Sequence, residues 1–148
     1  MLHSYLPEAI YGSSAVVLNN VMYGGYLSSR SVAWCRLKSK YVTSWQFMDL
    51  SNSNFKGYSW REALVVENKI VYFGSSNENR TFVLEKEEQS EKLRVVRQDE
   101  GIDLRRGFWN SSSCVFKNEI YAFKRKNYGD VHIYSLQSKK WNLFYLTQ

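Results

Sequence analysis

Short apolar runs separated by polar turns recur along the whole chain of 148 residues. Three segments share one pattern, in which a small residue stands five positions before an asparagine and a valine stands three positions before it. Methionine or isoleucine follows two positions after the asparagine. The segments are 14–23, 62–71 and 112–121, with the asparagines Asn20, Asn68 and Asn118, so that the spacings are 48 and 50 residues. A nearly fixed period of this length indicates a repeat architecture.

Each shared segment predicts a β-hairpin, because one apolar run ends at the asparagine and another begins directly after it. Asparagine tolerates the left-handed backbone conformation that a two-residue hairpin turn requires. A third strand is expected over 32–35, 81–84 and 131–134, and a fourth strand from Trp45, Leu93 and Trp141 onward. The pattern therefore predicts four short strands in each of three repeats, approximately 1–50, 51–99 and 100–148.

This pattern resembles the Kelch repeat, which builds one four-stranded blade of a β-propeller from about 50 residues. In that family the second strand ends in a Gly-Gly pair and the fourth carries a tryptophan. The first repeat keeps both glycines in Tyr23-Gly24-Gly25, and the second keeps only Gly74. Tryptophan is kept at Trp45 and Trp141, and Leu93 replaces it in the second repeat. The resemblance implies an all-β partial or half propeller of three four-stranded antiparallel blades. An antiparallel sandwich is the alternative that apolar alternation and Asn turns leave open.

Three blades are fewer than the four to eight from which closed propellers are built. The two end blades would each present an apolar face without a neighbouring blade. Two copies of the chain could form a ring, another protein could supply the missing blades, or the chain could be a piece of a longer protein. We expect that the propeller is completed by another chain, either a second copy or a protein partner.

Aromatic and arginine side chains gather in the connections that precede the first strands, and such side chains are the usual anchors of protein interfaces. Together with the loops after the second strands, these connections are expected to line one rim of the propeller. Similar surfaces of Kelch proteins bind protein partners. The alternative role of the tryptophans is to seal adjacent blades. The predicted partner-binding residues are Trp60, Arg61, Arg105, Arg106, Phe108, Trp109, Arg125 and Tyr128.

The chain is basic, with 20 Lys and Arg against 14 Asp and Glu and a net charge of +6. This excess favours an acidic partner, and binding of RNA or another polyanion through a basic surface is the alternative function. No motif of a nucleic-acid-binding fold accompanies the charge, so nucleic acid is not the expected partner.

Residues for catalysis or metal binding are scarce. The chain has two histidines, His3 and His132, and two cysteines, Cys35 and Cys114, without metal-ligand spacing. The copper oxidases among Kelch-like propellers need a Tyr, His and Cys cluster that two distant histidines do not supply. We therefore expect no enzyme activity, no catalytic residue, no metal and no cofactor, with an enzyme subunit as a third possibility. Both cysteines are expected to be small buried hydrophobic residues.

The chain has no run of about 18 apolar residues that would span a membrane, and its first ten residues lack the pattern of a secretory signal. Two cysteines do not make a disulfide framework. We therefore expect a cytoplasmic protein without membrane contact that acts as a protein-interaction or structural scaffold module.

Overall fold

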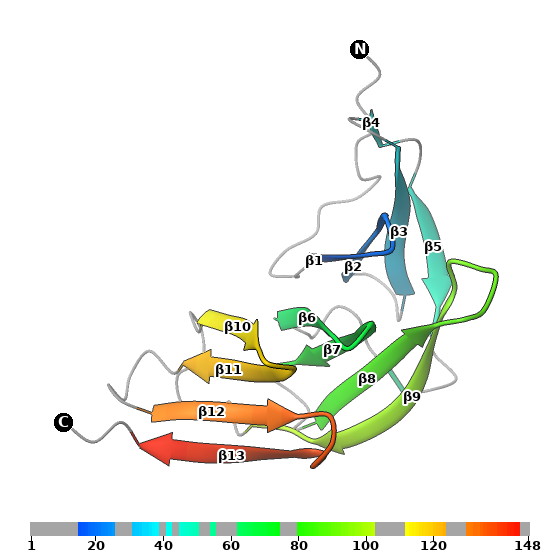
Figure 1. The fold of residues 1–148 in the computed structure, drawn as a ribbon. Coiled ribbons are helices and arrows are strands. Elements are labelled where there is room, and N and C mark those ends of the chain that lie inside the picture. The colour runs from blue at the N-terminus through cyan, green and yellow to red at the C-terminus, as the bar shows by residue number, and fades with distance from the viewer. Residues whose placement is uncertain are drawn as a thin grey trace.

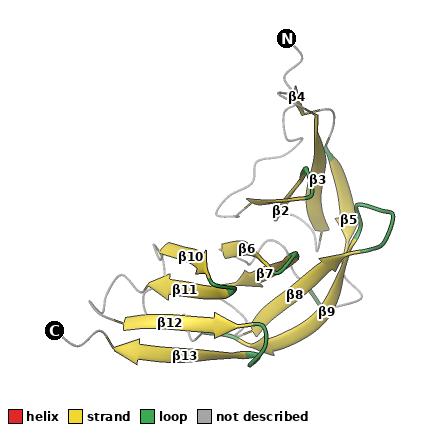
Figure 2. Ribbon diagram, in the orientation of Figure 1, coloured by secondary structure: helices red, strands yellow, loops and turns green. Residues whose placement is uncertain are grey.

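The computed structural model describes residues 15–25, 31–38, 41–42, 45–50, 54–55, 62–74, 80–102, 112–123 and 130–145. Every regular element in these ranges is a β-strand (Figure 2). Across these same ranges, no helix is long and apolar enough to cross a lipid bilayer. The predicted all-β fold is therefore confirmed.

The strands form three antiparallel sheets, here called blades, in which successive strands of the chain pair with one another. Blade 1 contains β1 (Ala15–Leu18), β2 (Val21–Gly25), β3 (Ser31–Lys38) and β5 (Gln46–Asp49), and the short β4 (Tyr41–Val42) pairs with the end of β3. Blade 2 contains β6 (Glu62–Val66), β7 (Lys69–Phe73), β8 (Arg80–Lys86) and β9 (Leu93–Glu100). Blade 3 contains β10 (Ser112–Phe116), β11 (Glu119–Phe123), β12 (Asp130–Ser135) and β13 (Lys140–Tyr145).

The three blades follow one another around a partial, unclosed ring (Figure 1). The first strands β1, β6 and β10 lie on the inner side of this ring, where β6 contacts both β1 and β10. The fourth strands β5, β9 and β13 lie on the outer side. This arrangement confirms the predicted propeller segment of three four-stranded blades, and the alternative of a sandwich is wrong.

The hairpin turns explain why asparagine recurs at the same place in each repeat. Each turn has two central residues, and both have a positive φ, as in the type I′ turn whose twist matches that of the flanking strands. The second central residues Asn20, Asn68 and Asn118 all have a φ of 61°. The first central residues Asn19, Glu67 and Lys117 have φ values of 51°, 47° and 48°. The predicted turns are confirmed.

The later strands of each repeat also begin close to their predicted places. The third-strand segments lie within β3, β8 and β12, and the fourth strands begin within one residue of the predicted positions. One alignment was wrong, because the turn between β8 and β9 is longer than the turn between β12 and β13: Lys86 pairs with Leu93, whereas Ser135 pairs with Lys140. Val95 therefore lies opposite Leu84, as Trp141 lies opposite Tyr134, and the residue that corresponds to the tryptophan is Val95.

The hydrophobic core consists of two layers, one at each junction between blades. We call the face that a blade turns toward the next blade in the chain its forward face, and the opposite one its backward face. At the first junction Val16, Leu18 and Tyr23 of blade 1 pack with Ile70, Tyr72 and Leu84 of blade 2. At the second junction Val66, Val71 and Phe73 of blade 2 pack with Ile120, Tyr134 and Leu136 of blade 3. Blade 2 is therefore covered on both faces.

Candidate protein interface

The eight predicted partner-binding residues all lie outside the described residues. They are Trp60, Arg61, Arg105, Arg106, Phe108, Trp109, Arg125 and Tyr128. The rim-binding hypothesis thus stays a prediction. The described residues do include both faces of every blade, and these faces supply a second kind of candidate interface.

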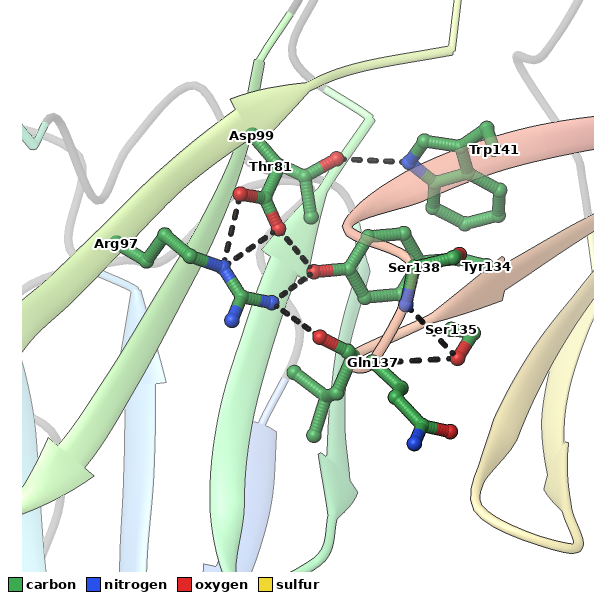
Figure 3. A network of polar contacts seen from close by, with 9 residues as sticks. Thr81, Arg97, Asp99, Tyr134, Ser135, Gln137, Ser138 and Trp141 are labelled. Carbon is green, nitrogen blue, oxygen red and sulfur yellow. Dashed lines mark hydrogen bonds and ion pairs between the residues drawn. The ribbon is translucent and has the colours of Figure 1, made fainter.

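A polar cluster joins blades 2 and 3 (Figure 3). Arg97 of β9 donates from Nε to both carboxylate oxygens of Asp99, at 2.8 and 2.9 Å. Its Nη2 donates to the hydroxyl of Tyr134 at 3.1 Å and to the carbonyl oxygen of Leu136 at 2.9 Å. The Tyr134 hydroxyl in turn donates to Asp99. Burial raises the pKa of Tyr134, and its hydrogen bond to Asp99 acts in the same direction. The cluster fixes β12 against the outer strand of blade 2.

The fourth-strand tryptophan of blade 3 contributes to the same junction. Trp141 donates from Nε1 to the hydroxyl oxygen of the buried Thr81 at 2.8 Å. Its ring centre lies 5.0 Å from that of Phe73 and 5.1 Å from that of Tyr134. The tryptophan that supports the Kelch resemblance therefore packs between blades, with its one polar atom paired.

The junction between blades 1 and 2 has polar contacts of its own. The buried Tyr23 donates its hydroxyl to the carbonyl oxygen of Glu91 at 2.9 Å, and Arg36 forms an ion pair with the Glu91 carboxylate at 2.7 Å. Burial raises the pKa of Tyr23 to about 12, and the hydrogen bond from Arg36 lowers the pKa of Glu91. Nearby, the backbone N–H of Leu93 donates to the sulfur of Met48 at 3.3 Å.

Where the first strands meet, a small residue allows close approach. β10 contacts β6, and Ser113 of β10 donates its hydroxyl to Glu62 of β6 at 3.1 Å. Burial raises the pKa of Glu62, while this hydrogen bond opposes the rise. Ala63 holds the corresponding position in β6, which contacts β1. At the two junctions within the chain, the small residue five positions before the asparagine thus lies where the first strands meet.

The forward face of blade 3 is a candidate interface, because large apolar side chains on it are exposed. By strand register it contains Cys114, Phe116, Tyr121, Phe123, Ile133 and Phe144. Phe116 is 57% exposed and Phe123 is 43% exposed. The residues that correspond to them in blade 2, Val66 and Phe73, are each 2% exposed because blade 3 covers them. Blade 3 therefore has an apolar face of the kind that blade 2 buries.

The two cysteines differ in exposure. Cys35 of β3 is buried as predicted, and burial raises the pKa of its thiol. Cys114 is exposed, so the prediction that it is buried is wrong. The reason is its place on the forward face of blade 3, since Leu64, which corresponds to it in blade 2, packs against the core of the second junction.

The backward face of blade 1 is the other face at an end of the partial ring. By strand register it contains Val17, Met22, Ala33, Cys35 and Phe47. Val17 and Phe47 are exposed, whereas Ala33 and Cys35 are buried. This face thus has small residues at its centre and larger apolar residues around them.

A groove of about 560 Å³ lies between the outer strands of blades 1 and 2. Its apolar lining comes from Phe47, Met48, Leu50, Leu93 and Val95, and its charged lining from Asp49, Glu87, Lys92 and Arg94. Within this lining, Arg94 is paired with Glu85.

The described residues offer little material for chemistry. In the ranges given above, no group of three or more His, Cys, Asp or Glu side chains is placed to hold a metal ion. His132 is half-buried on the backward face of blade 3, opposite Ala122 and Leu143. Its neighbours in the sheet are therefore apolar residues.

Comparison with known proteins adds no relative to this picture. No protein-family model matches the chain, and no curated protein matches it. The resemblance to Kelch repeats therefore rests on the repeated residues and on the three four-stranded antiparallel blades that they form.

Proposed function

We propose that this chain is a non-enzymatic protein-interaction or scaffold module whose partial propeller is completed by another polypeptide chain. The observation that supports this proposal is the exposed forward face of blade 3, with Phe116, Phe123 and Phe144 on its surface. Aromatic side chains on a rigid sheet supply a large apolar contact area at small cost in conformational entropy. We further propose that the repeats are Kelch-like and that the protein acts in the cytoplasm.

The mechanism of such a module is geometric. The inter-blade core and the polar cluster around Arg97, Asp99 and Tyr134 hold the blades rigidly. Rigid blades present a preformed face, so that little ordering is needed when the other chain binds. In a completed propeller, the predicted rim residues, Trp60 and Trp109 among them, would bind a further protein.

The alternative function, polyanion binding, has less support from the described residues. All four arginines in these ranges interact with side chains of the same chain: Arg36 with Glu91, Arg80 with Gln98, Arg94 with Glu85, and Arg97 with Asp99. These pairings compete with phosphate groups for the guanidinium donors. An acidic or neutral protein surface is therefore the better partner.

The proposal is tested by binding of the dye 8-anilinonaphthalene-1-sulfonate to the chain at a concentration where light scattering gives the mass of one chain. We expect fluorescence that falls strongly in the Phe116→Asp variant. Val96→Asp is the matched control, because Val96 is an exposed valine on β9 of blade 2. A monomer that binds no dye would contradict the proposal, as would a variant pair with equal fluorescence. A chain that is assembled at every concentration supports it, since another polypeptide then covers the face.

RNA binding distinguishes the alternative function. If a labelled single-stranded RNA binds the chain with an affinity that falls steeply with salt, the polyanion hypothesis replaces the proposal.

A further inference from the structure

The blades are stacked in the same direction at both junctions within the chain. In each, the forward face of one blade packs on the backward face of the next. The faces left at the two ends are one of each kind, the forward face of blade 3 and the backward face of blade 1. If the forward face of blade 3 in one copy contacted the backward face of blade 1 in another copy, the blades would continue to stack in the same direction.

The residues at one position of each junction match in polarity. The fourth-strand residues opposite Val32, Thr81 and Val131 are Met48, Asp99 and Phe144. On the backward face of the following blade, the residues at the position of Tyr134 are Leu84 in blade 2 and Cys35 in blade 1. At the second junction Asp99 accepts a hydrogen bond from the hydroxyl of Tyr134. At the first junction the apolar Met48 belongs to the same core cluster as the apolar Leu84.

The side chains exposed at the two ends follow the same rule, because Phe144 on the forward face of blade 3 and Val17 and Phe47 on the backward face of blade 1 are all apolar. An aspartate at the position of Phe144 would bury a carboxylate without a donor in a contact with them. The exposed side chains at the two ends are therefore chemically suited to one another.

We propose that the forward face of blade 3 docks on the backward face of blade 1 of a second copy of this chain. Each copy has one face of each kind, so two copies make two identical head-to-tail contacts and close a ring of six blades. Six lies within the four to eight blades of closed propellers. This inference rests on the proposed function and identifies the chain that completes the propeller.

The position of the tryptophans gives one specific contact. The ring of Phe73 on the forward face of blade 2 lies 5.0 Å from that of Trp141 at the start of β13. Phe123 holds the position of Phe73 in blade 3, and Trp45, directly before β5, holds the position of Trp141 when the register of β3 and β5 is extended by one residue. We therefore expect Phe123 of one copy to contact Trp45 of the other.

The test is the solution mass of the chain and of three variants by light scattering behind a sizing column. One chain has a mass of 17.5 kDa, so the head-to-tail dimer has about 35 kDa. Phe123→Asp on the forward face and Val17→Asp on the backward face are each expected to give the mass of one chain. The Val96→Asp control is expected to stay at about 35 kDa. All three positions are exposed, and circular dichroism of each variant verifies that it keeps its β-structure.

Other outcomes overturn the inference in distinguishable ways. A parent chain that is a monomer at all concentrations removes the second copy as the partner, and dye binding by that monomer keeps the proposed function. A series of masses above two chains overturns the closed ring. Dissociation by Phe123→Asp but not by Val17→Asp overturns the head-to-tail contact in favour of a contact between like faces.

Discussion

Replacing Tyr134 by phenylalanine removes a single hydroxyl from the polar cluster between blades 2 and 3. That hydroxyl donates to Asp99 and accepts from Arg97 at 3.1 Å. The side chain of Asp99 is only 5% exposed, so water does not easily replace the lost donor. Asp99 keeps its ion pair with Arg97 at 2.8 Å, which limits the damage.

The size of the effect follows from these contacts. A hydrogen bond to a charged group contributes about 1.5–3 kcal/mol to stability. One such bond is lost fully, and Arg97 retains its contact with the carbonyl oxygen of Leu136. We therefore expect Tyr134→Phe to lower the free energy of unfolding by about 2 kcal/mol. At this chain length the same change lowers Tm by roughly 4–8 °C.

Tyr72 supplies a matched comparison with the opposite expected sign. In the part of the chain that the structure describes, its hydroxyl is buried and has no hydrogen-bond partner. Burial is also the main reason why the pKa of Tyr72 is raised. Because an unpaired buried hydroxyl is destabilising, Tyr72→Phe is expected to leave stability unchanged or to raise it by up to about 1 kcal/mol.

Urea unfolding followed by tryptophan fluorescence measures both variants against the parent. We expect a difference of about 2–3 kcal/mol between these two variants, which undergo the same chemical change. Equal stability of Tyr134→Phe and the parent would refute the role assigned to the cluster. A loss of more than about 1 kcal/mol in Tyr72→Phe would refute the view that its hydroxyl is unpaired. Measurement at a fixed protein concentration keeps the contribution of assembly equal.

Three further predictions concern the turns and the junctions. Asn68→Val places a β-branched residue at a φ of 61°, which is expected to cost about 1–2 kcal/mol in urea unfolding, and an unchanged midpoint would contradict the turn assignment. Trp141→Phe removes the hydrogen-bond donor to the buried Thr81 and is expected to lower the free energy of unfolding by about 1–3 kcal/mol. A loss below about 0.5 kcal/mol, roughly the scatter of such measurements, would contradict this hydrogen bond. Tyr23 keeps its proton up to about pH 12 in the folded chain, whereas an unfolded tyrosine loses it near pH 10, so its contribution to stability is lost as the pH rises through this window. Tyr23→Phe should make alkaline unfolding less pH-dependent, and an identical pH profile would contradict this.

The repeat and its turns could be predicted from the sequence because their signals are local. Asn68 must adopt a positive φ, and few residues do so at low cost, so its recurrence marks the turn directly. A continuous apolar run likewise marks a strand whose two faces are both covered, as Phe82, Val83 and Leu84 do in β8. These two signals together were sufficient for the order of strands in each blade.

Contacts between blades could not be predicted in the same way. The cluster of Arg97 and Tyr134 joins residues 37 positions apart, and nothing local in the sequence relates their registers. The bulge between Val83 and Leu84 also leaves no periodic signal, nor does the longer turn that separates Lys86 from its partner Leu93. Cys114 is exposed because no described blade packs on the forward face of blade 3. The residue pattern of β10 alone does not show whether that face is covered.

Intermolecular disulfide formation tests the central claim most directly. Cys114 is exposed on the forward face of blade 3, and Val17 lies on the inner strand of the backward face of blade 1. Under mild oxidation, the Val17→Cys variant is predicted to form a covalent dimer of about 35 kDa on a non-reducing gel, twice the 17.5 kDa of one chain. The same variant with Cys114→Ser should form none. A Val17→Cys chain that stays uncrosslinked at concentrations where light scattering shows a dimer would contradict the head-to-tail ring.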